Sequence, residues 1–324
     1  MRPPARLAVP PLFGAVLAVA LAAAPATAAP AGTLFNGAVP TGTVHASSLR
    51  APAAAAPTGV RALGAELADA GTGQQLWGRD PGTKRPMGSV TKVMTALVVI
   101  EAGNLGRKIR VPASAVSYVA SHGASSAGLR AGDVLTARQL LNAMLLPSGC
   151  DAAYVLATAY GPGRAVFVAK MNAKARRLGL TKTHFSNFDG LPYPTPWATH
   201  STPANLVALG RAAMALATFR AIVDRRAYHL ANRNGHHGYT WWNTNLLLGH
   251  AGADGIKTGF TMAAGYCLLF EAHRGTRVLI GVVLHSTATR PSARFTAARR
   301  MLNWGFSVLA ASPFGRTIKT DRNR

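Results

Sequence analysis

The sequence predicts an α/β (α+β) sandwich, in which one antiparallel sheet from both chain ends is flanked by helices and an all-helical subdomain is inserted. Strand-like runs come early in the chain, and helical periodicity dominates the middle third. Two apolar, β-rich runs and an amphipathic helix come last. We therefore expect the early and late strands to share a single sheet.

The first elements are a hairpin and a helix. Two strand-like runs, 65–69 and 74–78, are separated by the turn sequence Gly-Thr-Gly at 71–73. A helix is expected from Ser89, whose hydroxyl suits an N-cap or a first-turn position. Its apolar residues recur at helical spacing: Val93, Met94, Leu97 and Val98.

The middle of the chain predicts helices and the end predicts strands. Thr136 can cap a helix that Pro147 ends, and Asp151 starts the next one. The runs GYCLLFEAH and RVLIGVVLH, joined by residues 274–276, indicate an antiparallel pair. A final amphipathic helix is expected over about 290–304.

The chain divides into four segments. Residues 1–28 show the basic start, apolar core and small cleavage-site residues of a signal peptide, whereas Pro10 and Pro11 disfavour an uncleaved anchor. Residues 29–59 are rich in Ala and Pro and are expected to be a disordered linker. A catalytic domain is predicted over 60–308, and a short basic tail over 309–324. We expect a secreted protein in the cell wall or at the outer face of the cytoplasmic membrane.

The charge is strongly positive. The chain has 35 Lys and Arg against 11 Asp and Glu, a formal net charge of +24. Outside the cell, such a charge favours electrostatic contact with anionic wall polymers or a membrane surface; a general bias in composition explains it equally well. Nucleic acid is disfavoured, because the basic residues show no aromatic interleaving and no binding motif. Two cysteines in a chain of 324 residues do not indicate a disulfide scaffold.

Ser89 and Lys92 form the sequence S-x-x-K at the start of the first helix. Residues three apart lie on one helix face, so the lysine amine can approach the serine hydroxyl. A lysine partly desolvated by apolar neighbours has a lowered pKa and can take the proton of a serine nucleophile. The alternative is a capping serine beside a lysine that extends to solvent.

Two further motifs decide between these interpretations. PSGCDAA places Ser148 in a Pro-Gly loop between two helices. ADGIKTGFT places Lys257, Thr258 and Gly259 at the start of an expected edge strand. S-x-x-K, a serine triplet and K-T-G in this order are the signature of penicillin-binding proteins and class A β-lactamases. The order of all three favours a catalytic site.

In these motifs the sequence resembles the low-molecular-weight D-alanyl-D-alanine carboxypeptidases, which are penicillin-binding serine peptidases. The resemblance extends over about 64–306 and includes SNFDGLP, WWNTNLLL, AAGYCLL and MLNWGF. It implies a β-lactamase-like fold and an enzyme that removes the terminal D-Ala of peptidoglycan stem peptides through an acyl-enzyme. It also implies covalent inhibition by β-lactams and requires no cofactor or metal.

The resemblance assigns catalytic roles by position. Ser89 would be the acylated nucleophile, Lys92 its general base, and Ser148 a proton shuttle between the lysines and the leaving amine.

Substrate-binding roles follow in the same way. Lys257 would hold the terminal carboxylate of the substrate, assisted by the Thr258 hydroxyl. Gly259 would let the strand approach the ligand closely. The backbone N–H groups of Ser89 and Phe260 would form the oxyanion hole.

Two residues depart from the usual family pattern. The serine triplet ends in Cys150 instead of asparagine, and a thiol donates and accepts hydrogen bonds only weakly, so we expect slower acylation. Neighbouring lysines could also make Cys150 a reactive thiol, although an inert small residue is the simpler interpretation. Phe260 replaces the histidine of some relatives, with little effect expected because only its N–H is needed.

Three other functions compete with hydrolysis. A D,D-transpeptidase shares every motif and differs only in the acceptor. A class A-like β-lactamase needs a glutamate after the serine triplet, and no glutamate lies between Ser148 and Lys257. A catalytically decayed wall-binding protein would not need the intact motifs. Metal binding is not expected, because adjacent His236 and His237 cannot both face one ion.

Overall fold

The computed structural model describes residues 55–311. In chain order the elements are β1 (Gly64–Asp69), β2 (Gln75–Arg79), β3 (Arg85–Pro86), the 3-10 turn η1 (Gly88–Thr91), α1 (Lys92–Ala102), β4 (Lys108–Arg110), α2 (Ala113–His122), β5 (Val134–Thr136), α3 (Ala137–Leu145), α4 (Cys150–Tyr160), α5 (Arg164–Arg177), β6 (His200–Ser201), α6 (Pro203–Met214), α7 (Ala217–Val223), β7 (Ala227–Leu230), β8 (Tyr239–Trp242), β9 (Ala253–Gly259), β10 (Cys267–Arg274), β11 (Arg277–Leu284) and α8 (Ala293–Ala311).

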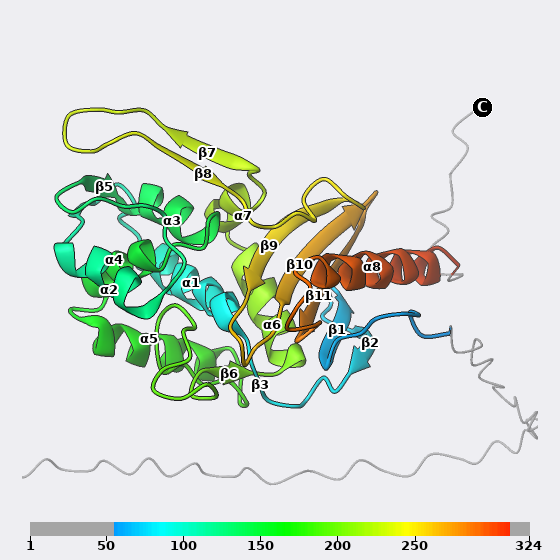
Figure 1. Cartoon of the computed structure of the whole chain (residues 1–324). Coiled ribbons are helices and arrows are strands. Elements are labelled where there is room, and N and C mark those ends of the chain that lie inside the picture. Colours follow the sequence, from blue (N-terminus) through cyan, green and yellow to red (C-terminus); the bar gives the residue numbers. More distant parts are fainter. Residues whose placement is uncertain (1–54, 312–324) are drawn as a thin grey trace, which may run out of the picture. The chain divides into compact units, whose positions relative to one another are not determined.

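The main sheet has five antiparallel strands in the order β2-β1-β11-β10-β9. Figure 1 shows the early strands, in blue, beside the late strands, in orange. Gly281 on β11 lies opposite both Leu67 and Phe270, and the absent side chain leaves room for the Phe270 ring. The predicted α+β sandwich with a sheet from both chain ends is confirmed.

Helices cover both faces of this sheet. Helix α8 packs on one face, against β11, β10 and β1, and α6 packs against the same three strands. Along β10, Leu268 and Phe270 belong to the cluster that contains Met301 of α8, whereas Leu269 belongs to the cluster that contains Leu206 of α6. The alternation follows from the two-residue period of a strand whose two faces are both buried.

Helix α1 lies between the sheet and the inserted helical subdomain. It contacts α3, α4 and α5 on one side and α6 and α7 on the other, and its residues 92–97 are all buried. A helix that is apolar on all sides belongs in a protein core. In the subdomain, Thr136 caps α3 as expected, in a capping box with Gln139. The N-terminal end of α1 therefore stands where the two halves meet.

Some predicted boundaries are wrong. The helix expected from Ser89 begins at Lys92, after the η1 turn. The K-T-G motif ends strand β9 instead of starting it, because the preceding Ala-Asp-Gly-Ile already pairs with β10. Helix α8 continues to Ala311, past the end expected at about 304, because the helix-compatible run SVLAA precedes Pro313. The short strand pairs β3-β6, β4-β5 and β7-β8 were not predicted.

The predicted signal peptide (1–28), most of the linker (29–59) and most of the tail (309–324) lie outside the described residues. In the part of the chain that the structure describes, no single helix has the length and hydropathy to cross a membrane; α6 and α7, bent by 105°, meet those criteria only as a pair.

Two buried carboxyl groups lie within the sheet, outside the predicted site. Glu66 on β1 and Glu271 on β10 are 4% and 7% exposed. Burial raises the pKa of each to about 7. The Glu66 Oε2 atom has no hydrogen-bond partner among the described residues. Ionised Glu66 therefore loses its hydration without compensation.

Glu66→Gln should stabilise the protein at alkaline pH and not at acid pH. The raised folded-state pKa means that stability is fully present below about pH 4.5 and is lost as the pH rises through about 7. At pH 8 we expect a gain of about 1–3 kcal/mol in the free energy of unfolding, measured by denaturant titration, and almost no gain at pH 4.5. The exposed Glu101→Gln is the control. An equal gain at both pH values would contradict the assignment.

Candidate active site

Ser89 and Lys92 meet at the start of α1. Ser89 lies in the 3-10 turn η1, and Lys92 is the first residue of the helix. Side chains three residues apart eclipse each other in a 3-10 turn. The Lys92 Nζ atom accordingly lies 2.8 Å from the Ser89 hydroxyl. The two residues are in hydrogen-bonding contact, although through a tighter turn than the α-helical one expected.

The Lys92 amine is completely buried and has two further contacts. It donates to the backbone carbonyl of Asp189 at 3.1 Å and lies 3.2 Å from the Cys150 sulfur. When the amine is unprotonated, these contacts use its two N–H groups. Its lone pair is then left facing the Ser89 hydroxyl proton, which is the arrangement a general base requires.

The Asp189 carbonyl is held in place by the side chain of the same residue. This carboxylate is fully buried and accepts from the Tyr118 hydroxyl at 2.9 Å and from the Leu191 N–H at 3.2 Å. Burial, together with the Asp189 charge, raises the pKa of Tyr118, so the phenol remains a donor. The loop that orients Lys92 is thus tied to helix α2.

Backbone packing brings the Ser89 and Phe260 N–H groups to one cavity. Gly88 has φ +52°, and a Cβ atom there would lie 2.8 Å from the Phe260 nitrogen. The η1 turn therefore packs directly on the end of β9. Ser89 lies in the first turn of η1, where backbone N–H groups have no partner within the helix. Both residues line the cavity, so the structure brings the predicted oxyanion donors together.

Ser148 lies in the loop between α3 and α4, with φ +69°. Its carbonyl accepts from the Ser125 hydroxyl at 2.7 Å, and both serines line the cavity. Within the described residues the Ser148 hydroxyl makes no hydrogen bond to Lys92 or Lys257. Its role as a proton shuttle stays a prediction, since the hydroxyl is free to rotate toward a ligand.

Cys150 is the first residue of α4 and is 1% exposed. Its sulfur lies between the Lys92 amine and the Ser125 hydroxyl, at 3.2 and 3.6 Å. Burial outweighs the attraction of Lys92 and raises the pKa of the thiol. The side chain therefore fits an uncharged packing partner of the base and does not fit a reactive thiolate.

Lys257 is buried near the cavity, and its predicted contact with a substrate carboxylate stays a prediction. Its side chain is buried, 1% exposed, and its amine donates to the Thr258 carbonyl at 3.1 Å. Desolvation and the charges of Lys92 and Arg294 hold the pKa of Lys257 well below its usual value. Lys257 does not line the cavity, whereas Thr258 and Gly259 do. Its amine is nonetheless close enough to Lys92 and Arg294 for their charges to act on it.

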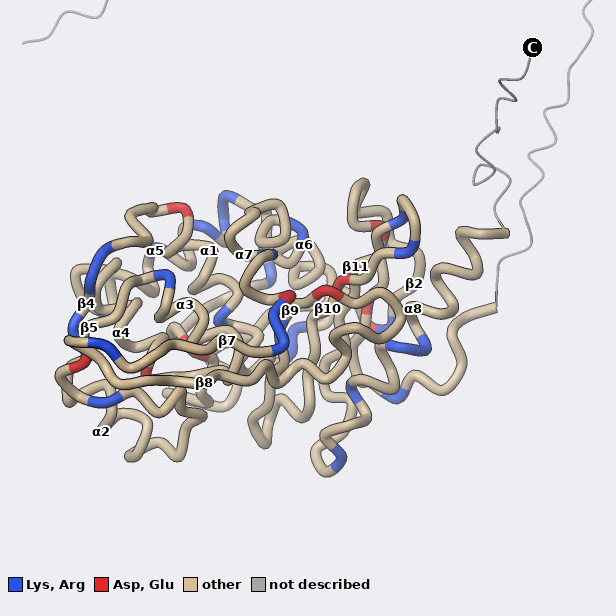
Figure 2. The backbone as a smooth tube through the Cα atoms, turned by 90° about the horizontal axis from the view of Figure 1, so that it is seen from above, with Lys and Arg blue, Asp and Glu red and all other residues tan. Residues whose placement is uncertain are grey.

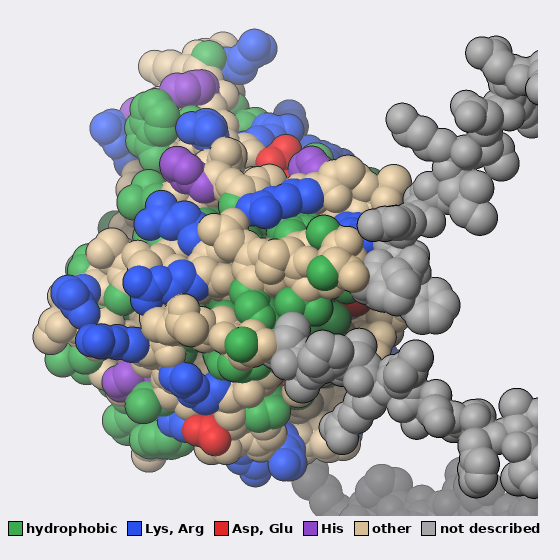
Figure 3. All heavy atoms as spheres, turned by 90° about the vertical axis from the view of Figure 1, so that its right-hand side faces the viewer, with side chains coloured by type: hydrophobic (Ala, Val, Ile, Leu, Met, Phe, Trp, Pro, Cys, Tyr) green, Lys and Arg blue, Asp and Glu red, His purple; other side chains and the backbone are tan. Residues whose placement is uncertain are grey.

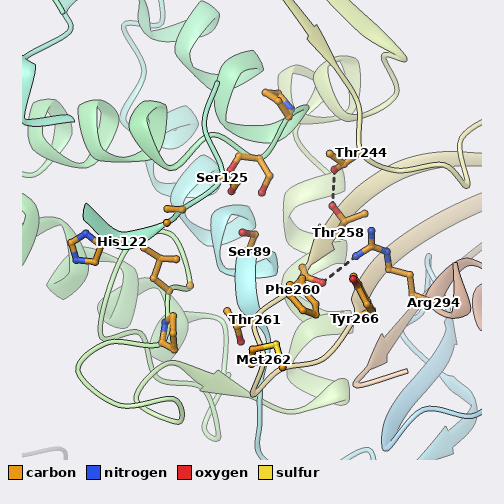
Figure 4. Close-up of a pocket in the computed structure, with 18 residues that line it drawn as sticks. Ser89, His122, Ser125, Thr244, Thr258, Phe260, Thr261, Met262, Tyr266 and Arg294 are labelled. Atoms are coloured by element: carbon orange, nitrogen blue, oxygen red, sulfur yellow. Dashed lines mark hydrogen bonds between the residues drawn. The ribbon is translucent and has the colours of Figure 1, made fainter. Parts of the chain in front are cut away.

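Arg294 supplies the cation that does face the cavity. It comes from the first turn of α8, donates to the Gly259 carbonyl at 3.3 Å and lies over the Tyr266 ring. Nearby, the Thr258 and Thr244 hydroxyls are 2.7 Å apart. Figure 4 shows these groups on one side of Ser89. One arginine and two hydroxyls make a site for a carboxylate.

The cavity of about 420 Å³ lies between the helical subdomain and β9 (Figure 4). Sequence analysis gave no role to Arg294, Thr244 or Ser125, because none belongs to the three catalytic motifs and each reaches the cavity only through folding. Among the described residues no group of three or more His, Cys, Asp or Glu side chains could hold a metal ion.

Comparisons with known proteins agree with this geometry. Residues 51–288 match the family described as D-alanyl-D-alanine carboxypeptidase. A D-alanyl-D-alanine carboxypeptidase of Streptomyces sp. (strain K15) is 41% identical over 262 residues, which cover 77% of this chain and 88% of that protein. The carboxypeptidase DacB2 of Mycobacterium tuberculosis is 36% identical, with 75% and 81% covered.

Solved structures give the same result. The crystal structure of the Streptomyces K15 DD-transpeptidase is 40% identical, has a TM-score of 0.73 and covers 78% of this chain and all of that one. A D-alanyl-D-alanine carboxypeptidase from Mycobacterium tuberculosis is 33% identical, with a TM-score of 0.69 and coverage of 78% and 96%.

Proposed function

This chain belongs to the D-alanyl-D-alanine carboxypeptidase family, and from that premise we propose that it removes the terminal D-alanine of peptidoglycan stem peptides through an acyl-enzyme at Ser89. The observation that carries the proposal is the 2.8 Å contact between the Ser89 hydroxyl and the buried Lys92 amine. This contact unites a nucleophile with its base next to a carboxylate-binding group of residues.

Acylation follows from the positions of these groups. The Ser89 oxygen attacks the carbonyl carbon of the scissile D-Ala-D-Ala amide while Lys92 takes its proton. The N–H groups of Ser89 and Phe260 stabilise the negative oxygen of the tetrahedral intermediate. When the C–N bond breaks, the proton passes from Lys92 by way of Ser148 to the leaving amine, and D-alanine departs. An ester remains on Ser89.

The terminal carboxylate of the substrate determines which of its amide bonds lies at Ser89. It is placed against Arg294 and the Thr258 and Thr244 hydroxyls, which line one side of the cavity. Lys257, which the sequence predicts to hold this carboxylate directly, does not line the cavity, so its contact with the substrate stays a prediction. A substrate without a free terminal carboxylate should therefore be a poor one.

Water resolves the acyl-enzyme without a dedicated base. Asp189 is the acid nearest the base lysine, and its carboxylate is already bound by Tyr118 and Leu191. A β-lactam acyl group should therefore stay on Ser89, unlike in a β-lactamase. Transfer to an amine is the second candidate, because the Streptomyces K15 structure is named a DD-transpeptidase.

Mass spectrometry and product analysis test the proposal. After exposure to a labelled penicillin, we expect one adduct, on Ser89, that persists for many minutes. A synthetic stem peptide ending in D-Ala-D-Ala should release D-alanine, with no cross-linked product unless an acceptor amine is added.

Lys92→Gln should slow acylation by about 100- to 10,000-fold, and Arg294→Gln should weaken peptide turnover by about tenfold. The exposed Arg299→Gln is the matched control. An adduct elsewhere, or none, would overturn the proposal, and rapid loss of the label would indicate a β-lactamase.

Cys150→Asn should increase the rate of acylation by a fluorescent penicillin. The amide donates to a ligand carbonyl more strongly than a thiol does, and it still accepts from Lys92. Cys150→Ala removes the sulfur without adding a donor and should give no increase. Thermal unfolding of both variants controls for the larger side chain in a buried position. A rate that is unchanged or lower in folded Cys150→Asn would contradict this role.

We also propose that the positive charge holds the protein near an anionic wall polymer or membrane surface, in keeping with an extracytoplasmic location. Lys and Arg positions are spread along the backbone in Figure 2, and the face shown in Figure 3 has many basic side chains and few acidic ones. Arg61, Arg290 and Arg300 line a further cavity of about 450 Å³ whose lining contains no acidic residue. Vesicles with anionic lipids should sediment the protein at low salt and release it at high salt. Equal binding to neutral vesicles would exclude this contact.

A further inference from the structure

A second cavity, of about 400 Å³, lies beside the active site in the helical subdomain. Helix α2, helix α5 and the 186–193 loop form its walls. Its lining includes Tyr118, His122, Arg164, Asn187, Phe188 and Tyr193. None of these residues takes part in the acylation described above, apart from the support that Tyr118 gives to Asp189.

Aromatic rings make the walls of this cavity apolar. The Tyr118 ring lies 4.4 Å from that of His122 and 5.7 Å from that of Phe188. The Tyr193 ring meets His122 edge-on at 4.9 Å and is 47% exposed. Such contacts fix the rings in place and leave their faces available for an aliphatic ligand chain.

Arg164 brings the one full positive charge to this lining. Its guanidinium lies 4.4 Å from the Tyr154 ring centroid, and no acidic side chain in the described part of the chain pairs with it. The polar groups of the loop are already used, because Asn187 donates to the Leu191 carbonyl and Ser186 to the Tyr193 carbonyl. Arg164 is therefore the group left to recognise an anion.

The two cavities adjoin at His122, which lines both. Figure 4 shows His122 and Arg294 on opposite sides of Ser89. A substrate whose terminal carboxylate lies at Arg294 has its scissile amide at Ser89. The rest of its chain must then extend away from Arg294, toward the His122 side.

We propose that this second cavity binds the part of the stem peptide that precedes D-Ala-D-Ala, and that Arg164 pairs with a carboxylate carried by that part. The inference rests on the proposed function, because it takes the direction of the substrate from it. The aromatic walls contact the aliphatic portion of the peptide, and the guanidinium selects for its charge. The contact is made equally in the ground state and the transition state, so its loss raises KM and leaves kcat unchanged.

Three synthetic peptides test the proposal on the intact protein. The first is diacetyl-L-Lys-D-Ala-D-Ala, which has no upstream carboxylate. The second is L-Ala-γ-D-Glu-L-Lys-D-Ala-D-Ala, which carries a free carboxylate on the γ-linked glutamate. The third is the same pentapeptide with that carboxylate amidated. Release of D-alanine from each gives KM and kcat separately.

The wild-type protein should prefer the free pentapeptide over its amidated form by about two- to fivefold in KM, the size of an exposed charge pair. Arg164→Gln should abolish this preference, and Arg164→Lys should retain part of it. Tyr193→Ala should raise KM for both pentapeptides relative to the short peptide. Arg176→Gln on the same helix and Trp197→Ala in the neighbouring loop are exposed controls outside the cavity and should behave as wild type.

Equal KM values of Arg164→Gln and Arg176→Gln for each of the three peptides would overturn the inference, provided that thermal unfolding shows both variants folded. If both Arg164→Gln and Arg176→Gln lose the preference for the free over the amidated pentapeptide, the preference comes from the overall positive charge of the protein. That result would overturn the inference too. Failure of the proposed function is recognised separately, because wild-type protein would then form no penicillin adduct on Ser89. A wild-type protein that is acylated and turns over all three peptides with the same KM would refute only the second cavity.

Discussion

The buried Lys92 amine is the constraint on which the rest of the site depends. A lysine enters a protein core only if its polar atoms are bound. Its three partners come from separate segments: the η1 turn, the start of α4 and the Asp189 loop. Satisfying them fixes the helical subdomain against the sheet. The geometry of the nucleophile therefore follows from the packing of a single side chain.

Positive charge is divided between the inside and the rim of the site. Lys92 and Lys257 are both buried, and the charge of Lys92 helps to lower the pKa of Lys257, whereas Arg294 keeps its charge at the cavity wall. This division separates two tasks that one lysine could not combine: a base must be able to lose its proton, and an anion-binding group must keep it. Lys257 of the K-T-G motif is thus one of the buried groups, whereas Arg294 of α8 is one of the groups that bind the substrate.

The sequence predicted those parts of the fold and the site that depend on local spacing. The antiparallel pairing of the two apolar runs in β10 and β11, the cap at Thr136 and the S-x-x-K contact each depend on a short stretch of sequence, and the structure agrees with them. The 3-10 turn before Lys92 was missed, because it forms where Gly88 packs on Phe260, far along the chain. Arg294, Thr244 and the Asp189 carbonyl were missed for the same reason: tertiary contacts alone bring them to the cavity. The cavity beside His122 has no sequence signature at all, since aromatic residues of two helices and a loop produce it together.

The fate of the acyl group follows from what surrounds it. Phe260 is stacked on Tyr266 with ring centroids 4.3 Å apart, and Cys150 stays uncharged beside the base. Neither side chain supplies a carboxylate to activate water, and within residues 55–311 the base in contact with Ser89 is Lys92, which also served in acylation. By microscopic reversibility, an amine that occupies the place of the departed D-alanine uses the same proton path in reverse. Hydrolysis and transfer therefore compete for one base and one space, and an acceptor with a carboxylate for Arg294 has the advantage of being bound there, which water does not have.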